Sequence, residues 1–180
     1  ALGDEGADLV ANCKKAIASA TLSMAKDLYN AKDFEGAAAA FVKAKEVAEG
    51  YGETEIAEEA AELVNQANAL KFNTEGKAAM KAKDFPTAIS CFTKVLELDP
   101  TNGAAAVQLG QACMNAGQLD EAVAALETAM ANGQEKNAAK ILSNVYLKKA
   151  QASNKAKNYQ EVIDFAAKSN EALENGNAYK

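Results

Sequence analysis

One short motif recurs four times along this chain, and each copy is typical of a turn between two helices. The copies occupy residues 31–37, 82–88, 116–122 and 156–162. Each has a polar turn, then a large apolar residue, and three positions later a small or β-branched residue. The polar residue can cap the second helix, and the small residue lets the two helices cross closely. Because one hairpin cannot bury its apolar face alone, the motif predicts a stack of helical hairpins.

The composition also favours helices over strands. Ala, Lys, Glu, Leu and Gln dominate, and these residues have high helix propensity. Only two prolines occur, and Pro86 falls where the first turn of a helix tolerates a missing N–H. We therefore expect an all-α chain of about eight helices, at 7–30, 33–50, 54–83, 85–98, 103–116, 119–132, 135–157 and 159–175.

Two central segments carry a more specific pattern. Residues 69–102 contain Phe72-x2-Glu75-Gly76-x2-Ala79 before the turn and Ala88-x3-Phe92 after it. Residues 103–136 contain Leu109-Gly110-x2-Cys113 and then Ala122-x3-Leu126. The large residues after the turns, Phe85 and Leu119, are 34 positions apart. This pattern resembles the tetratricopeptide repeat family, although the usual tryptophan is absent.

The resemblance implies a fold and a division of the chain. The fold would be antiparallel helical hairpins stacked as a right-handed α-α superhelix. All 180 residues would form a single repeat domain, with approximate repeats at 18–51, 69–102, 103–136 and 143–176. Gly76 and Gly110, costly inside a helix, would be compensated by close helix–helix contact, so Gly110→Leu would overpack the core.

The resemblance also implies a binding surface, because the first helix of each hairpin lines a concave groove in this family. Amides there can pair with an extended peptide backbone, and ammonium groups attract carboxylates. The alternative is that these side chains form only the solvated face of amphipathic helices. The groove candidates are Lys26, Asn73, Lys77, Lys81, Gln108, Gln111, Asn115, Asn144, Lys148 and Gln151.

Some members of the family grip a peptide's C-terminal carboxylate with a set of Lys, Asn and Arg side chains. The aligned places here are Asn73, Lys77, Gln108, Asn144 and Lys148. Lys stands where the family has Arg, so the set keeps only the chemical character of that clamp.

The residues that the sequence lacks argue against catalysis. The chain has no His and no Arg, and all 19 basic residues are Lys. His is the commonest general base and metal ligand, and no phosphate-binding glycine loop occurs. Carboxylates at 53, 55, 58, 59 and 62 suit a divalent cation by spacing, but without His they favour a solvated helix start. We expect no enzyme activity, no cofactor and no metal site.

The net charge of −6 argues against nucleic-acid binding, which needs a basic face. No apolar run is long enough for membrane insertion. The three cysteines favour buried free thiols, with a Cys91–Cys113 bridge as the alternative. The missing initial Met suits a bacterial exported or periplasmic protein slightly better than a cytoplasmic one.

Together these features predict a protein- or peptide-binding scaffold that uses its concave groove. The alternative is a structural, self-associating array, either part of a longer repeat protein or a homo-oligomer formed through the C-terminal repeat. The segment 175–180 supports that alternative, because it resembles the junction at 101–104 that opens a new repeat.

Overall fold

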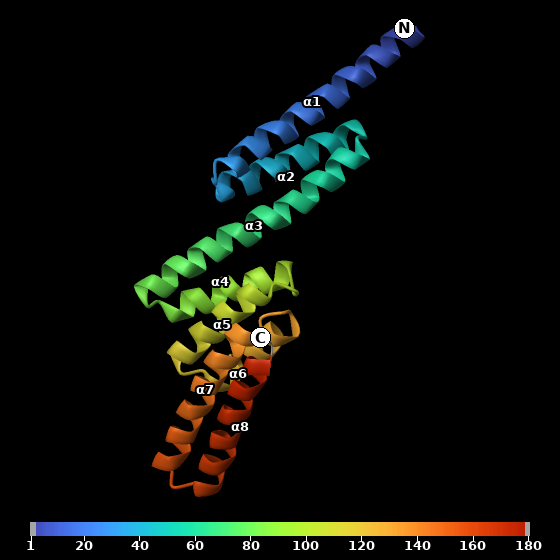
Figure 1. The fold of residues 1–180 in the computed structure, drawn as a ribbon. Coiled ribbons are helices and arrows are strands. Elements are labelled where there is room, and N and C mark those ends of the chain that lie inside the picture. The colour runs from blue at the N-terminus through green and yellow to red at the C-terminus, as the bar shows by residue number, and fades with distance from the viewer. Residues whose placement is uncertain (1–2, 179–180) are drawn as a thin grey trace. The chain divides into compact units, whose positions relative to one another are not determined.

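The computed structural model describes the backbone of residues 3–178, and all of its regular elements are helices (Figure 1). Each predicted helix is present, and no observed end lies more than three residues from the expected one. The all-α hairpin fold is therefore confirmed. The helices are α1 (Asp4–Asn30), α2 (Phe34–Tyr51), α3 (Thr54–Ala82), α4 (Phe85–Leu98), α5 (Gly103–Ala116), α6 (Leu119–Ala131), α7 (Glu135–Lys155) and α8 (Tyr159–Ala178).

The chain forms two compact units, Ala1–Lys71 and Phe72–Lys180. The division falls inside the long helix α3, where no turn or proline interrupts the sequence. The single domain over 1–180 and its four repeat boundaries remain predictions.

In the first unit, α1 and α2 lie side by side as an antiparallel hairpin, and the first part of α3 packs against them. The core contains Phe41, Ala25 and Ala37 with Ala60 and Ala67 of α3, all fully buried. Such small side chains let the helices approach closely.

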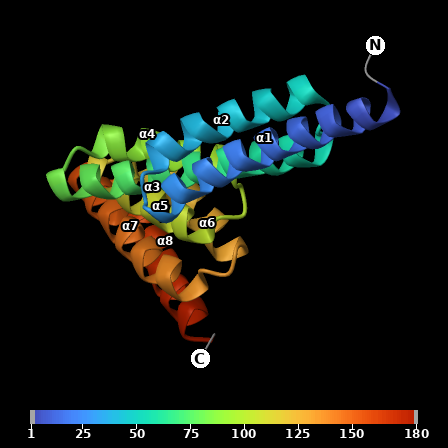
Figure 2. The ribbon, with the colours of Figure 1, turned by 90° about the horizontal axis from the view of Figure 1, so that it is seen from above.

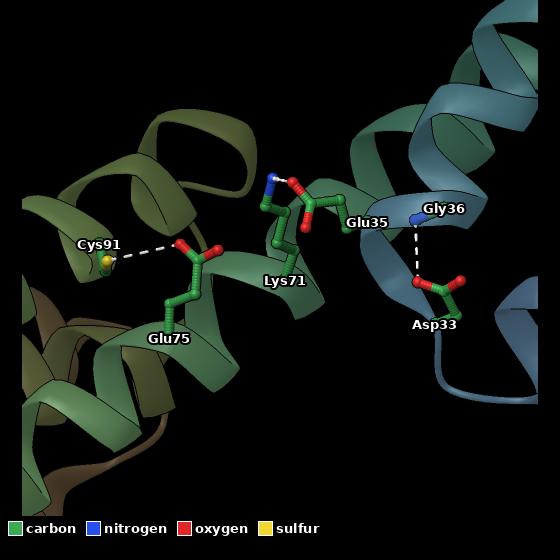
Figure 3. Close-up of polar contacts among 6 residues, drawn as sticks. All are labelled: Asp33, Glu35, Gly36, Lys71, Glu75 and Cys91. Carbon is green, nitrogen blue, oxygen red and sulfur yellow. Dashed lines mark hydrogen bonds and ion pairs between the residues drawn. The ribbon is translucent and has the colours of Figure 1, made fainter.

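Two ion pairs link α3 to this hairpin. The Nζ of Lys26 lies 2.6 Å from Oε1 of Glu59, and the Nζ of Lys71 lies 2.7 Å from Oε1 of Glu35 (Figure 3). Because these side chains are partly solvated, each pair contributes less than about 1 kcal/mol.

In the second unit, each helix from α4 onward packs against the next helix along the chain. The pairs α5 with α6 and α7 with α8 form hairpins, whereas α4 packs on α5 and α6 on α7. The view in Figure 2 shows α7 and α8 running along each other. Phe92, Val95, Leu126 and Val145 are the largest described side chains of this unit that are at most 1% exposed.

The repeated motif sets the start of every second helix. Phe34, Phe85, Leu119 and Tyr159 are the first residues of α2, α4, α6 and α8. The predicted cap forms at two of the four turns with good geometry. Asp33 accepts from the backbone N of Gly36 at 2.9 Å (Figure 3). Asp84 accepts from the backbone N of Thr87 at 3.2 Å.

The other two caps differ. Asn158 accepts from Glu161 at 3.5 Å, which is long for a hydrogen bond. The predicted cap is wrong for Gln118, whose side chain makes no cap hydrogen bond. Gln is one methylene longer than Asn and is not among the favoured N-cap residues.

The second residue of each motif has a left-handed backbone. It is Gly117 in one turn, with φ 82°, but Lys32, Lys83 and Lys157 in the others, with φ 60° to 63°. This conformation costs a residue with a Cβ about 1 kcal/mol or more, whereas glycine adopts it readily.

We expect Lys83→Gly to raise the free energy of unfolding by about 0.5–1 kcal/mol, because glycine removes the left-handed strain. Urea denaturation followed by circular dichroism measures the change. The same substitution at Lys81, which lies within α3, is the matched control and should lower stability by about 1 kcal/mol. If both variants lose stability equally, the strain argument is wrong.

The expectation of free thiols is confirmed for all three cysteines, and the alternative, a Cys91–Cys113 bridge, is not formed. Two expectations need correction. Cys91 and Cys113 are buried as expected, but Cys13 is exposed. Residues 175–178 continue α8, and therefore do not form a junction like that at 101–104; residues 179 and 180 lie outside the described residues. Within residues 3–178, no helix is long and apolar enough to cross a membrane.

Candidate functional site

The candidates on α5 form a row of amides on one side of the helix. Gln108 and Gln111 are half-buried, and Asn115 is exposed one turn further on. The Nε2 of Gln111 donates to Oδ1 of Asn115 at 3.3 Å. This hydrogen bond fixes the orientation of two amides while leaving other donors and acceptors of both groups available.

The candidates on α7 are all exposed, and one of them reaches α5. Asn144, Lys148 and Gln151 follow one side of α7. The Nζ of Lys148 donates to the backbone oxygen of Met114 at 3.3 Å. The two helices also contact each other directly. The structure therefore places Lys148 of α7 against α5.

The motif alanines at 116 and 156 align these two helices residue by residue. Counted back from them, Gln108 corresponds to Lys148, and Gln111 to Gln151. Equivalent positions thus carry long polar side chains on neighbouring first helices. A surface of this kind offers repeated hydrogen-bonding groups at the spacing of the repeat.

Three candidates lie on α3. Lys77 and Lys81 are exposed, and the same count from Ala82 makes Lys77 the equivalent of Gln111. Asn73 is half-buried, and its equivalents are the apolar Val107 and Leu147. Asn73 therefore shares less with the other two helices than the predicted alignment assumed.

Lys26 is the only candidate in the first unit. It is equivalent to Lys77, but its ammonium group is paired with Glu59 at 2.6 Å. The sequence did not indicate this partner, because 33 positions separate the two residues. That ion pair makes Lys26 less available to a ligand than the other lysines.

Burial among the helices shifts the pKa values of two cysteines and one tyrosine. Burial raises the pKa of the Cys91 thiol, and the carboxylate of Glu75 raises it further (Figure 3). Burial likewise raises the pKa of Cys113, with Glu121 adding to the effect. Burial raises the pKa of Tyr146, helped by Glu127. All three groups are therefore neutral at pH 7, which does not suit a nucleophile or a general base.

The described residues contain no cluster of three or more His, Cys, Asp and Glu side chains that could hold a metal ion. In the acidic cluster at the start of α3, the carboxylate of Glu59 forms an ion pair with Lys26.

Sequence reasoning missed one surface, an apolar groove on the α1–α2 hairpin. The exposed residues Ile17 and Met24, seven positions apart, were the available signal.

Comparison with known proteins supports the resemblance. The family model described as "Tetratricopeptide repeat" matches residues 79–145, which run from the end of α3 through α4, α5 and α6 into α7. No curated protein matches the chain.

Several solved structures are similar in fold. A crystal structure of MamA is 17% identical, with a TM-score of 0.45, over 83% of this chain and 94% of that one. YrrB, titled as a TPR protein with an unusual peptide-binding site, is 19% identical, with a TM-score of 0.46 and 84% of each chain covered. The TPR2AB domain of yeast Sti1, solved as a complex with pHSP90, is 13% identical, with a TM-score of 0.45 over 92% of this chain and 95% of that one. These similarities are too distant to transfer a binding site.

Proposed function

Because this chain carries tetratricopeptide repeats over residues 79–145, we propose that it is a protein- or peptide-binding scaffold whose ligand lies across the first helices of its hairpins. The observation that carries the proposal is the direct packing of α5 on α7, with Lys148 bonded to the backbone of Met114. This packing supports one continuous polar surface rather than two separate helix faces.

An extended peptide suits the side chains of this surface. A peptide backbone presents alternating donors and acceptors, and a primary amide supplies both. Gln108, Gln111 and Asn115 lie one turn apart on α5, while Asn144 and Gln151 offer the same groups on α7. Hydrogen bonds to the backbone give affinity without demanding a particular ligand sequence.

The lysines favour a ligand that carries a carboxylate, either on an Asp or Glu side chain or at its C-terminus. Lys77 and Lys81 are exposed on α3, and Lys148 is exposed on α7. An ammonium group on such a surface attracts a carboxylate and raises the association rate more than the final affinity. We therefore propose a ligand whose carboxylate lies near Lys148.

Catalysis is not part of this proposal. The chain has no His, and its buried thiols have raised pKa values. The exposed surface groups, amides and lysines, are suited to holding a ligand rather than to activating one.

The test is a binding screen with a library of nine-residue peptides that carry free C-terminal carboxylates, measured beside the same library with C-terminal amides. We expect selected peptides to bind, and the amidated forms to bind more weakly. Lys148→Glu should weaken binding by about tenfold or more, because it replaces attraction with repulsion.

The matched control is Lys140→Glu, the same change at an exposed lysine of α7 outside the candidate set. It should leave the affinity nearly unchanged. If both variants bind the selected peptides as the natural chain does, then the ligand does not use this surface. Equal losses in both variants would indicate only a general charge effect.

A further inference from the structure

The α1–α2 hairpin has an open apolar groove on its surface. Ile17, Met24 and Leu28 of α1 line it together with Ala40 and Val47 of α2, and its volume is about 690 Å³. Met24 is 70% exposed and Ile17 is 48% exposed. Within the described residues of this unit, no further helix covers these side chains. Contiguous exposed apolar side chains of this kind are a candidate interaction surface.

The repeat shows what kind of element fits this groove. Counted from the motif alanines at 31 and 116, Met24 and Leu28 correspond to Leu109 and Cys113. Counted from the first residues of α2 and α6, Ala40 corresponds to Ala125. The groove on α1–α2 is thus the counterpart of a surface on α5–α6.

On α5–α6 that surface is shared with α4, the second helix of the preceding hairpin. Leu109, Cys113 and Ala125 line one groove with Ile89 and Leu96 of α4. Ile89 and Leu109 also pack against the same buried cluster. The α1–α2 groove therefore has the features of an acceptor for a second helix of the same repeat type.

Helix α8 presents the matching side chain. Ile163 is the fifth residue of α8, as Ile89 is of α4 and Val123 of α6. Ile89 and Val123 are half-buried against the core of the unit, but Ile163 is 63% exposed. The β-branched residue at this position therefore packs against the core in α4 and α6, but it is exposed in α8.

The lining of the groove is balanced in charge, with Lys43 of α2 and Asp27 of α1. We therefore expect the occupant of the groove to be held by the burial of apolar side chains rather than by ion pairs.

We propose that α8 of one copy of this chain docks in the α1–α2 groove of a second copy, so that Ile163 meets Met24 as Ile89 meets Leu109 within one chain. The occupant is a second copy, and the contact joins two different surfaces. Such a head-to-tail contact adds further copies as the concentration rises. It uses neither the amides of α5 nor the lysines of α7, so it stands apart from the proposed peptide site.

The test measures mass in solution by sedimentation velocity over a wide range of concentrations. We expect the natural chain to form dimers and longer species as concentration rises. Met24→Glu and Ile163→Glu should each abolish this association, since either one places a charge in the contact. Both side chains are mostly exposed, and circular dichroism checks that the variants stay folded.

Mixing the two variants gives the sharpest result. One keeps an intact α8 and the other an intact groove, so an equal mixture should form dimers and nothing larger. Val42→Glu, at an exposed valine of α2 that does not line the groove, should associate as the natural chain does. A natural chain that stays monomeric would overturn the proposal. So would a mixture in which the two variants do not pair, which would indicate that each copy uses the same surface in the contact.

Discussion

Replacing Gly110 with leucine is expected to lower the free energy of unfolding by about 3 kcal/mol or more, although leucine has the higher helix propensity. A Cβ added at Gly110 would lie 2.5 Å from Cγ of Leu126 and 3.3 Å from the backbone oxygen of Ala122. The Leu126 side chain is fully buried, so it can yield only by displacing the close-packed side chains around it. Overpacking therefore outweighs the propensity gain of about 1 kcal/mol.

Urea denaturation followed by circular dichroism measures this loss, and Gly50→Ala is its control. Gly50 also lies inside a helix, but a Cβ there would meet nothing within 4 Å. We expect Gly50→Ala to gain up to about 1 kcal/mol. A stabilised Gly110→Leu variant would show that α5 and α6 separate easily, which would contradict the close packing described above.

The sequence predicted the helices well because the turns carry strong local signals. Each helix that follows a motif starts at its large apolar residue, and caps at Asp33 and Asp84 stabilise two of those starts. The close contacts at Gly76 and Gly110 were also predictable, since a glycine inside a helix needs a compensating contact. Those contacts are present, with Phe92 and Leu126.

Other features depend on contacts that no local pattern encodes. The left-handed backbone of Lys32, Lys83 and Lys157 gives no sequence signal, because lysine is not a residue that favours it. The division of the chain falls inside α3, where the helical pattern continues unbroken.

The candidate site was predictable only as a face of each helix. The sequence indicated which residues of α5 and α7 share that face, but the bond from Lys148 to the backbone of Met114 depends on how the hairpins pack. The partner of Lys26, Glu59, likewise lies in a different helix.

Phe92 packs opposite Gly76, and replacing Phe92 is expected to have the second large effect on the free energy of unfolding. The eighth residues of the second helices are Phe41, Phe92, Leu126 and Ala166, counted from their first residues. The ring of Phe92 is fully buried, and its Cε1 and Cζ would lie 2.9 Å from a Cβ at Gly76. The ring therefore fills the space that the missing side chain leaves.

Phe92→Ala is expected to lower the free energy of unfolding by about 3–5 kcal/mol, because it removes buried apolar area and leaves a cavity between α3 and α4. Phe92→Leu should cost clearly less, since Leu126 fills the same position opposite Gly110 in the next hairpin. Phe85→Ala is the control, because Phe85 is only half-buried. Urea denaturation of the three variants gives the order. If Phe92→Ala and Phe85→Ala lose the same stability, the packing of Phe92 against Gly76 does not determine how closely α3 and α4 approach. If Phe92→Leu loses as much stability as Phe92→Ala, then leucine cannot replace phenylalanine opposite Gly76 as it does opposite Gly110.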